Sequence, residues 1–109
     1  MKKIVTGSAN LDKMDQINMM VANAVDIKSC EAMIITVSKW VVMQDEDSGK
    51  TVIVIKATDG TYYASISGVF IDAFMTVATA YGDMDGVSIK VIKGTSKQGR
   101  NFFSLELVK

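Results

Sequence analysis

The sequence contains no histidine and a single cysteine, Cys30, among its 109 residues. Zinc sites, histidine general bases and cysteine–histidine nucleophiles are built from these two residue types. One cysteine cannot form a disulfide within the chain, and we expect Cys30 to be a small buried side chain rather than a reactive thiol. We therefore predict that the protein is not an enzyme and that it uses no metal and no cofactor.

Two short motifs that could suggest a ligand also lack essential parts. Gly94 and Gly99 have the spacing of a phosphate-binding P-loop, but Arg-Asn follows where Lys-Ser/Thr is required, and a strand pattern replaces the helix. The acidic run at 45–49 lacks the spacing and the distal glutamate of a calcium-binding EF-hand. We interpret this run as an acidic hairpin turn.

An excess of charge and long apolar runs are missing as well. The chain has 12 basic and 12 acidic residues, so its formal net charge is zero and no overall positive field draws it to nucleic acid or to an acidic membrane. No apolar stretch approaches the ~20 residues of a membrane-spanning helix, and no apolar signal region follows the basic start at 1–6. These absences predict a cytoplasmic protein without a membrane partner, in which any basic binding surface is local.

Helical spacing of apolar residues predicts a helix over 11–25. We expect the helix to pack on the rest of the protein, with self-association or a contact with a partner protein as the alternatives. Asn10 or Asp12 can cap its first turn. The predicted buried stripe, with its flanking residues, consists of Leu11, Met14, Ile17, Met20, Val21, Ala24 and Val25.

Five later segments have strand patterns, and a second helix pattern separates the third from the fourth. The strands are predicted at 33–43, 51–57, 61–67, 87–93 and 101–108. The helix is predicted from apolar spacing at Phe70, Phe74, Val77 and Tyr81, with Ser67 as its cap and Gly82 at its end.

This order of elements is that of the OB-fold, a partly open five-stranded barrel that binds oligonucleotides or oligosaccharides. We therefore predict a mainly β, OB-fold-like chain that forms one domain over 1–109. In this prediction residues 31–109 form the barrel, and residues 1–30 are a helical extension packed on it. Other small α+β arrangements are the alternative.

Side-chain parity selects the aromatic rings that can face outward. Phe102 shares its parity with polar residues of the last strand, whereas Phe103 shares its parity with leucines. Trp40 has the parity of polar residues in the first strand, and only one of Tyr62 and Tyr63 can face outward. Exposed rings stack on bases at ~1 to 3 kcal/mol per base. We predict a platform of Phe102, Trp40 and one tyrosine; the alternative is that these rings fill the barrel or lie beneath the N-terminal helix.

Basic residues are concentrated near the same rings and suggest a local cationic track for phosphates. Lysines on a solvated hairpin tip, where they discourage strand addition, are the alternative interpretation. The predicted track consists of Lys90, Lys93, Lys97 and Arg100 at the last hairpin, with Lys39 and Lys56 from other strands.

Lys39 has the parity of the apolar face of its strand. Either a bulge reverses the phase of the strand at this point, or the predicted register is wrong. Both possibilities would also reassign Trp40 to the opposite face.

Two stretches have a distinctive order and spacing: Asp-Gly-Thr-Tyr-Tyr-Ala-Ser-Ile-Ser at 59–67, and Lys-Val-Ile-Lys-Gly-Thr-Ser at 90–96, followed by Gly99 and Asn-Phe-Phe-Ser-Leu at 101–105. Together they resemble the small single-stranded-DNA-binding proteins of tailed phages that prime replication with a protein. This resemblance makes replication proteins an alternative partner of the N-terminal helix. The resemblance covers roughly 33–109, and little of the N-terminal third aligns.

Proteins of this family coat displaced single strands during phage genome replication, protect them from nucleases and prevent re-annealing, without strong sequence preference. The resemblance implies single-stranded DNA as the partner, a location in the host-cell cytoplasm, and aromatic ligand positions at Tyr62 or Tyr63 and at Phe102 or Phe103. Two other classes stay open: a protein-interaction module that uses the same rings and the N-terminal helix, and an oligosaccharide-binding barrel.

Overall fold

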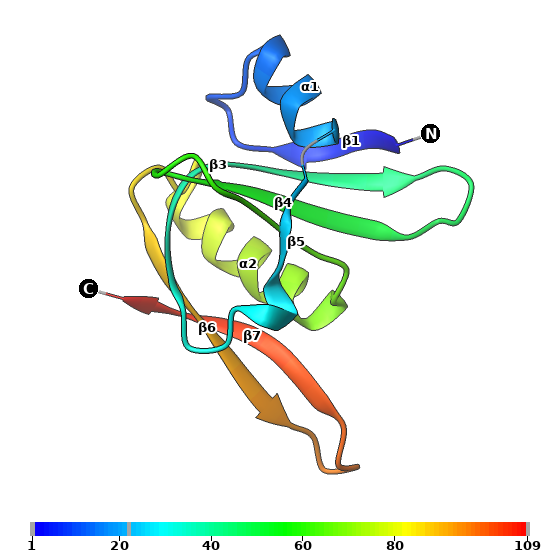
Figure 1. Ribbon diagram of the computed structural model, residues 1–109, viewed down its shortest axis with the longest axis vertical. Coiled ribbons are helices and arrows are strands. Elements are labelled where there is room, and N and C mark those ends of the chain that lie inside the picture. The colour runs from blue at the N-terminus through cyan, green and yellow to red at the C-terminus, as the bar shows by residue number, and fades with distance from the viewer. Residues whose placement is uncertain (1, 22, 109) are drawn as a thin grey trace.

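A computed structural model describes residues 2–21 and 23–108 of the chain. Position 22 of the predicted N-terminal helix, and positions 1 and 109 at the ends of the predicted domain, lie outside the described residues. The described part is mainly β with two α-helices (Figure 1). Its elements are β1 (Lys2–Gly7), α1 (Lys13–Val21), β2 (Val25–Asp26), the 3-10 helix η1 (Ile27–Ser29), β3 (Ile34–Asp45), β4 (Thr51–Ala57), β5 (Tyr62–Ser65), α2 (Gly68–Tyr81), β6 (Ser88–Thr95) and β7 (Asn101–Val108).

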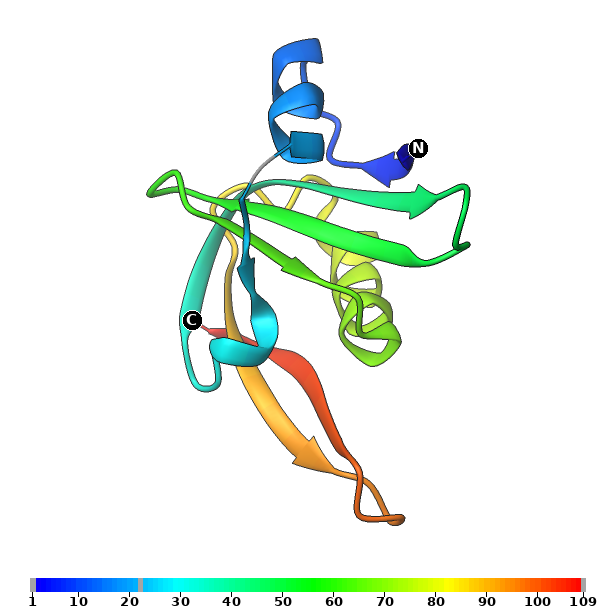
Figure 2. The same ribbon diagram turned by 45° about the vertical axis from the view of Figure 1, so that its right-hand side comes forward.

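Strand β3 is the centre of a single curled sheet. One edge of β3 pairs with β4, while its other edge pairs with β6 near its start and with β1 near its end. The sheet continues from β4 to β5 and β2 on one side and from β6 to β7 on the other, and only the β2–β5 pair is parallel among the described pairs. The β3–β4 and β6–β7 hairpins therefore project in different directions (Figures 1 and 2).

The curled sheet is open between its two edge strands, β2 and β7, which form no ladder with each other in the described part of the chain. Helix η1 lies near this opening, between the end of β2 and the start of β3 (Figure 2). Its Ile27 and the following Cys30 are buried in the main core, as predicted for Cys30.

Helix α2 lies in the concave side of the sheet and carries the centre of the main core. Phe70 and Phe74 are fully buried, and Trp40 meets Phe74 edge to face with ring centroids 5.4 Å apart. The hydroxyl of Ser67 accepts a hydrogen bond from the Phe70 N–H at the first turn, and Gly82 ends the helix at a φ of 67°. Both predicted ends of this helix are confirmed.

A bulge between Val37 and Lys39 reverses the phase of β3. Val37 faces the main core before the bulge and Trp40 faces it after the bulge, while Lys39 lies on the outer face. Trp40 is only 4% exposed, so its predicted place on an open platform is wrong. The parity of a continuous strand misassigned Trp40 because the extra residue shifts every later side chain by one position.

The N-terminal segment differs most from the prediction. It contributes β1 and β2, so the described sheet has seven strands rather than five. Neither described helix has the length and apolar character needed to cross a membrane.

Helix α1 presents a different face to the protein from the one predicted. Asp15 and Met19 are its buried residues, whereas Met14, Ile17 and Val21 are exposed. The prediction is confirmed for Leu11 and Met20, which pack against the sheet, but it is wrong for these three exposed residues. Two polar interactions favour this orientation of the helix. Asp15 pairs with Lys39, and the Asp12 and Asp15 carboxylates accept each other's N–H groups in a capping box.

With α1 held in this orientation, Met19 covers a small outer cluster on the convex face of the sheet. The other buried members of this cluster are Val41, Met43 and Val54. Met19 is therefore the most deeply buried apolar side chain of α1, and Met20 packs beside it against the same cluster.

The two methionines of α1 allow a matched test of this orientation. Met19→Ala should lower the free energy of unfolding by ~2 to 5 kcal/mol, because it leaves a cavity over the outer cluster. Met14→Ala should change it by less than about 0.5 kcal/mol, because Met14 is 71% exposed. Chemical denaturation measures both values, and equal losses would contradict the orientation of α1.

Candidate nucleic-acid interface

Phe102 lies directly over Gly94, its partner on β6. A Cβ placed on Gly94 would stand 2.3 Å from Cζ of the Phe102 ring, so the ring occupies the space that any other residue would fill. An aromatic ring that covers a strand glycine is held against the sheet. Phe102 is half-buried, so part of its ring remains accessible.

A groove of about 550 Å³ adjoins this ring, and we name it the Phe102 groove. It lies near the opening of the sheet, where η1, the start of α2 and β7 come together (Figures 1 and 2). Its lining residues are Lys28, Ile66, Ser67, Val69, Asn101, Phe102 and Phe103.

Phe103 lines the same groove although it points to the other face of β7. Its ring is half-buried and packs against the main core. Both neighbouring rings meet the groove because β7 is the last strand of the sheet, so the groove follows an edge and contacts both faces. The groove therefore has two aromatic side chains from adjacent positions.

The β6–β7 hairpin carries three exposed cations near Phe102. Lys97 and Arg100 lie in its turn, whereas Lys93 stands opposite Phe103, on the other face of the hairpin from Phe102. None of the three forms an ion pair within residues 2–21 and 23–108. Backbone hydrogen bonds within the turn hold it in place. The Ser96 N–H donates to the Arg100 carbonyl at 2.8 Å, and the Gly99 N–H donates to the Ser96 carbonyl at 2.9 Å. An ordered turn thus carries a local positive charge.

Lys90 is set apart from these three cations. It stands opposite Glu106 of β7 and Ile34 of β3, near the start of β6. An acidic cross-strand neighbour offsets the charge of Lys90. The predicted cationic track therefore narrows to the hairpin end of β6 and β7.

Lys39 and Lys56 lie on another face, near α1. The Lys39 ammonium pairs with the Asp15 carboxylate, and this hydrogen bond lowers the pKa of Asp15 and raises the pKa of Lys39. The Lys56 ammonium stands 5.9 Å from the centre of the Tyr62 ring, a cation–π distance. The residues predicted as one cationic track are thus divided between the β6–β7 side of the molecule and the face near α1.

The two adjacent tyrosines have different surroundings. Tyr63 is 5% exposed in the main core, where burial raises the pKa of its phenol. Its ring is not accessible for stacking. Tyr62 is half-buried beside the outer cluster under α1, so it is the outward member of the pair.

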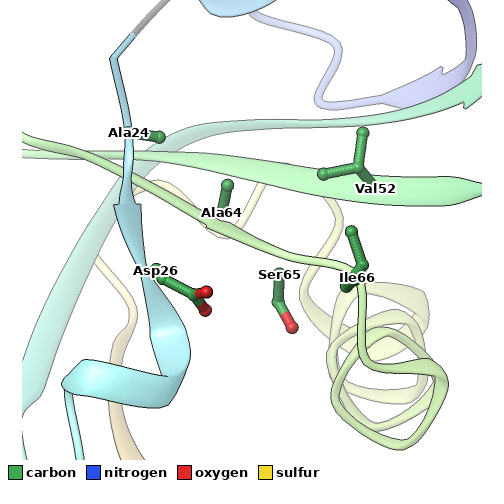
Figure 3. A pocket seen from close by; sticks show the side chains of 6 residues that line it. All are labelled: Ala24, Asp26, Val52, Ala64, Ser65 and Ile66. Carbon is green, nitrogen blue, oxygen red and sulfur yellow. The ribbon is translucent and has the colours of Figure 1, made fainter.

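A second groove, of about 210 Å³, adjoins the Phe102 groove at Ile66, which lines both. Figure 3 shows Asp26 of β2 beside it, and no basic residue lines it. The Asp26 carboxylate accepts the Lys28 N–H at 3.0 Å and caps η1. The complete lining is Ala24, Asp26, Val52, Ala64, Ser65 and Ile66.

Sequence patterns did not identify several lining residues of the Phe102 groove. Lys28 stands between the predicted first helix and the predicted first strand, in a segment without periodicity. Ile66 and Val69 carry no signal for binding because single exposed apolar residues are common. The pairing of Gly94 with Phe102 follows only from the register of the hairpin.

Among the described residues, no group of three or more cysteine, aspartate or glutamate side chains is placed to bind a metal ion. The interface offers aromatic rings, amide and hydroxyl groups and cations.

Gly94→Ala should move the Phe102 ring off the sheet while leaving the protein folded. The added methyl group collides with the far end of a rotatable side chain, so a rotation of the ring relieves the contact at small cost. NMR should show large changes in the Phe102 ring resonances and a thermal midpoint within a few degrees of the original. Ser104→Ala, on the same face of β7, is the control; unchanged ring resonances in Gly94→Ala would contradict the described contact.

Comparison with known proteins adds an independent finding. A family model described as Phage Single-stranded DNA-binding protein matches residues 23–108, a range that includes η1, the Phe102 groove and the basic hairpin. No curated protein and no solved structure gives a significant match. Because this family match spans most of the sequence, the chain belongs to the phage single-stranded DNA-binding protein family.

Proposed function

We propose that the protein binds single-stranded DNA without strong sequence preference and protects displaced strands during phage DNA replication. One observation carries the proposal: the accessible ring of Phe102 is held on Gly94 in a hairpin that also carries Lys93, Lys97 and Arg100, three exposed cations that form no ion pair within the described residues. The ring offers a stacking surface for a base, and the cations attract the phosphates on either side. Membership of the phage family supports the same ligand.

Weak sequence preference follows from the kinds of contact at this interface. Every base has a flat π-face, so stacking on Phe102 accepts all four bases. Lysine side chains attract phosphates, which are the same at every position of the strand. The interface therefore binds the backbone and the stacked bases rather than a particular sequence.

The distribution of charge restricts where the strand lies. The hairpin between β3 and β4 carries Glu46 and Asp47 at its tip, which repel phosphates, and Lys39 is already paired with Asp15. We propose that the DNA contacts mainly the β6–β7 side of the molecule. This would give a footprint near the lower end of the ~4 to 16 nucleotides bound by one OB-fold.

The architecture that we propose for this function is an OB-like barrel. Strands β3 to β7 follow one another with α2 between β5 and β6, which is the element order of that fold. We further propose a single domain, with the N-terminal segment packed on the barrel, that acts in the host-cell cytoplasm without catalysis.

A second candidate function is a protein-interaction module. Met14, Ile17 and Val21 are 71%, 54% and 76% exposed and occur on successive turns of α1. Such a stripe suits self-association or a contact with a replication protein. This function and DNA binding use different surfaces, so one does not exclude the other.

Titration of a labelled oligonucleotide at several salt concentrations tests the electrostatic part of the proposal. Log affinity should fall linearly with log salt, with a slope of about −0.7 for each phosphate contacted. Three contacting cations correspond to a slope of about −2. A flat salt dependence, or equal affinity for duplex DNA, would contradict the proposal.

Phe102→Leu tests the stacking part because it keeps apolar bulk and removes the flat ring. Its affinity for a single-stranded oligonucleotide should fall by the ~1 to 3 kcal/mol of one stacked base, with little change in thermal stability. Phe103→Leu is the matched control, and it should lower stability more than Phe102→Leu because Phe103 packs against the main core. Unchanged affinity of Phe102→Leu would exclude Phe102 as a stacking surface.

A further inference from the structure

We infer that the Phe102 groove holds an unstacked nucleotide of the bound strand, and that Lys28 of η1 binds a phosphate at its rim. This inference rests on the proposed function and extends it to a second segment of the chain. It assigns a ligand contact to η1, which lies outside the basic hairpin.

The shape and lining of the groove suit a nucleotide. Its volume of about 550 Å³ falls within the ~300 to 1,000 Å³ of small-molecule sites. Aromatic rings of β7 form one side, and Ile66 and Val69, both substantially exposed, provide further apolar surface. The polar groups of Ser67 and Asn101 also line it. An apolar groove with a few polar groups is suited to a base that carries a sugar.

Lys28 extends the positive charge to η1. The Lys28 side chain is exposed and forms no ion pair within the described residues. The backbone around Lys28 is fixed, because the neighbouring Ile27 and Cys30 are buried and the Asp26 carboxylate accepts a hydrogen bond from the Lys28 N–H. The hairpin and Lys28 therefore supply cations from two separate segments, while the groove itself is largely apolar. This arrangement favours phosphates at the rim and a base inside.

The adjoining groove lacks this combination. It contains the Asp26 carboxylate and no basic residue, so a phosphate there would be repelled. Ile66 forms the boundary between the two grooves. Charge therefore favours the phosphates of the bound DNA at the Phe102 groove rather than at the adjoining groove. We expect the DNA strand to turn away at Ile66.

Val69 permits a charge-exchange test in which binding and stability change in opposite directions. It is 49% exposed in the first turn of α2, so both Val69→Glu and Val69→Lys should fold. The helix dipole favours glutamate and disfavours lysine at this end, so Val69→Glu should have the higher thermal midpoint. A phosphate at the rim of the groove reverses the order for binding: the affinity for oligo(dT) should fall about two- to fivefold in Val69→Glu and rise by a similar factor in Val69→Lys.

The same exchange at Val5 is the matched control. Val5 is 58% exposed on β1, away from the groove, and its two variants should bind oligo(dT) with nearly equal affinity. Lys28→Ala should also reduce the slope of log affinity against log salt by about 0.7, whereas Lys13→Ala on α1 should leave that slope unchanged.

The outcomes separate this inference from the proposed function. Opposite effects at Val69, together with a reduced slope for Lys28→Ala, support the groove as a nucleotide site. If Arg100→Ala weakens binding while the Val69 and Lys28 variants behave like their controls, the groove inference is wrong and the proposed function stands. If the unaltered protein does not bind oligo(dT), both are wrong.

Discussion

The fold depends on the pairing of β3 along both of its edges. This strand is long enough to pair with β4 on one edge and with both β6 and β1 on the other. The bulge after Val37 increases its local twist, which helps the sheet to curl around α2. Because β3 links the two halves of the sheet, it also sets where β2 and β7 remain apart. The groove proposed to bind a nucleotide exists because that gap is not closed by a strand pair.

The positive charge at the proposed DNA-binding surface depends on which lysine and arginine side chains already lie beside acidic residues. The chain has equal numbers of basic and acidic residues, so a binding surface for phosphates requires their separation in space. Lys39 is paired with Asp15, and Lys90 stands opposite Glu106. The exposed cations of the β6–β7 hairpin have no such recorded partner in the described part of the chain. A neutral protein can in this way present a cationic surface at one end.

The aromatic residues divide in a similar way between packing and binding. Trp40 and Tyr63 are large rings in the main core, where they stabilise the fold and are inaccessible to a ligand. Phe102 stays accessible because it packs on a glycine at the projecting end of a hairpin, where the core no longer covers it. The Phe102 ring contributes to both packing and binding: one side of the ring packs on Gly94 of β6, and the other side is available to a base.

The sequence by itself determined several local elements and indicated the family. Periodicity and capping residues placed α2 from Ser67 to Gly82, and strand patterns located β4 and β7 correctly, because local spacing and turn residues specify them. The residues around 59–67 and 90–105 also indicated the phage single-stranded DNA-binding family, to which the chain belongs.

Only the tertiary structure decided which side chains are accessible and which lie together. A one-residue bulge moved Trp40 into the core, and two carboxylate interactions orient α1 with Met14, Ile17 and Val21 toward solvent. Lys28 and Phe102 are far apart in the chain and meet at one groove because the sheet curls. Periodicity reports the spacing of neighbours along a strand or helix, whereas burial and proximity depend on long-range pairing that no local pattern contains.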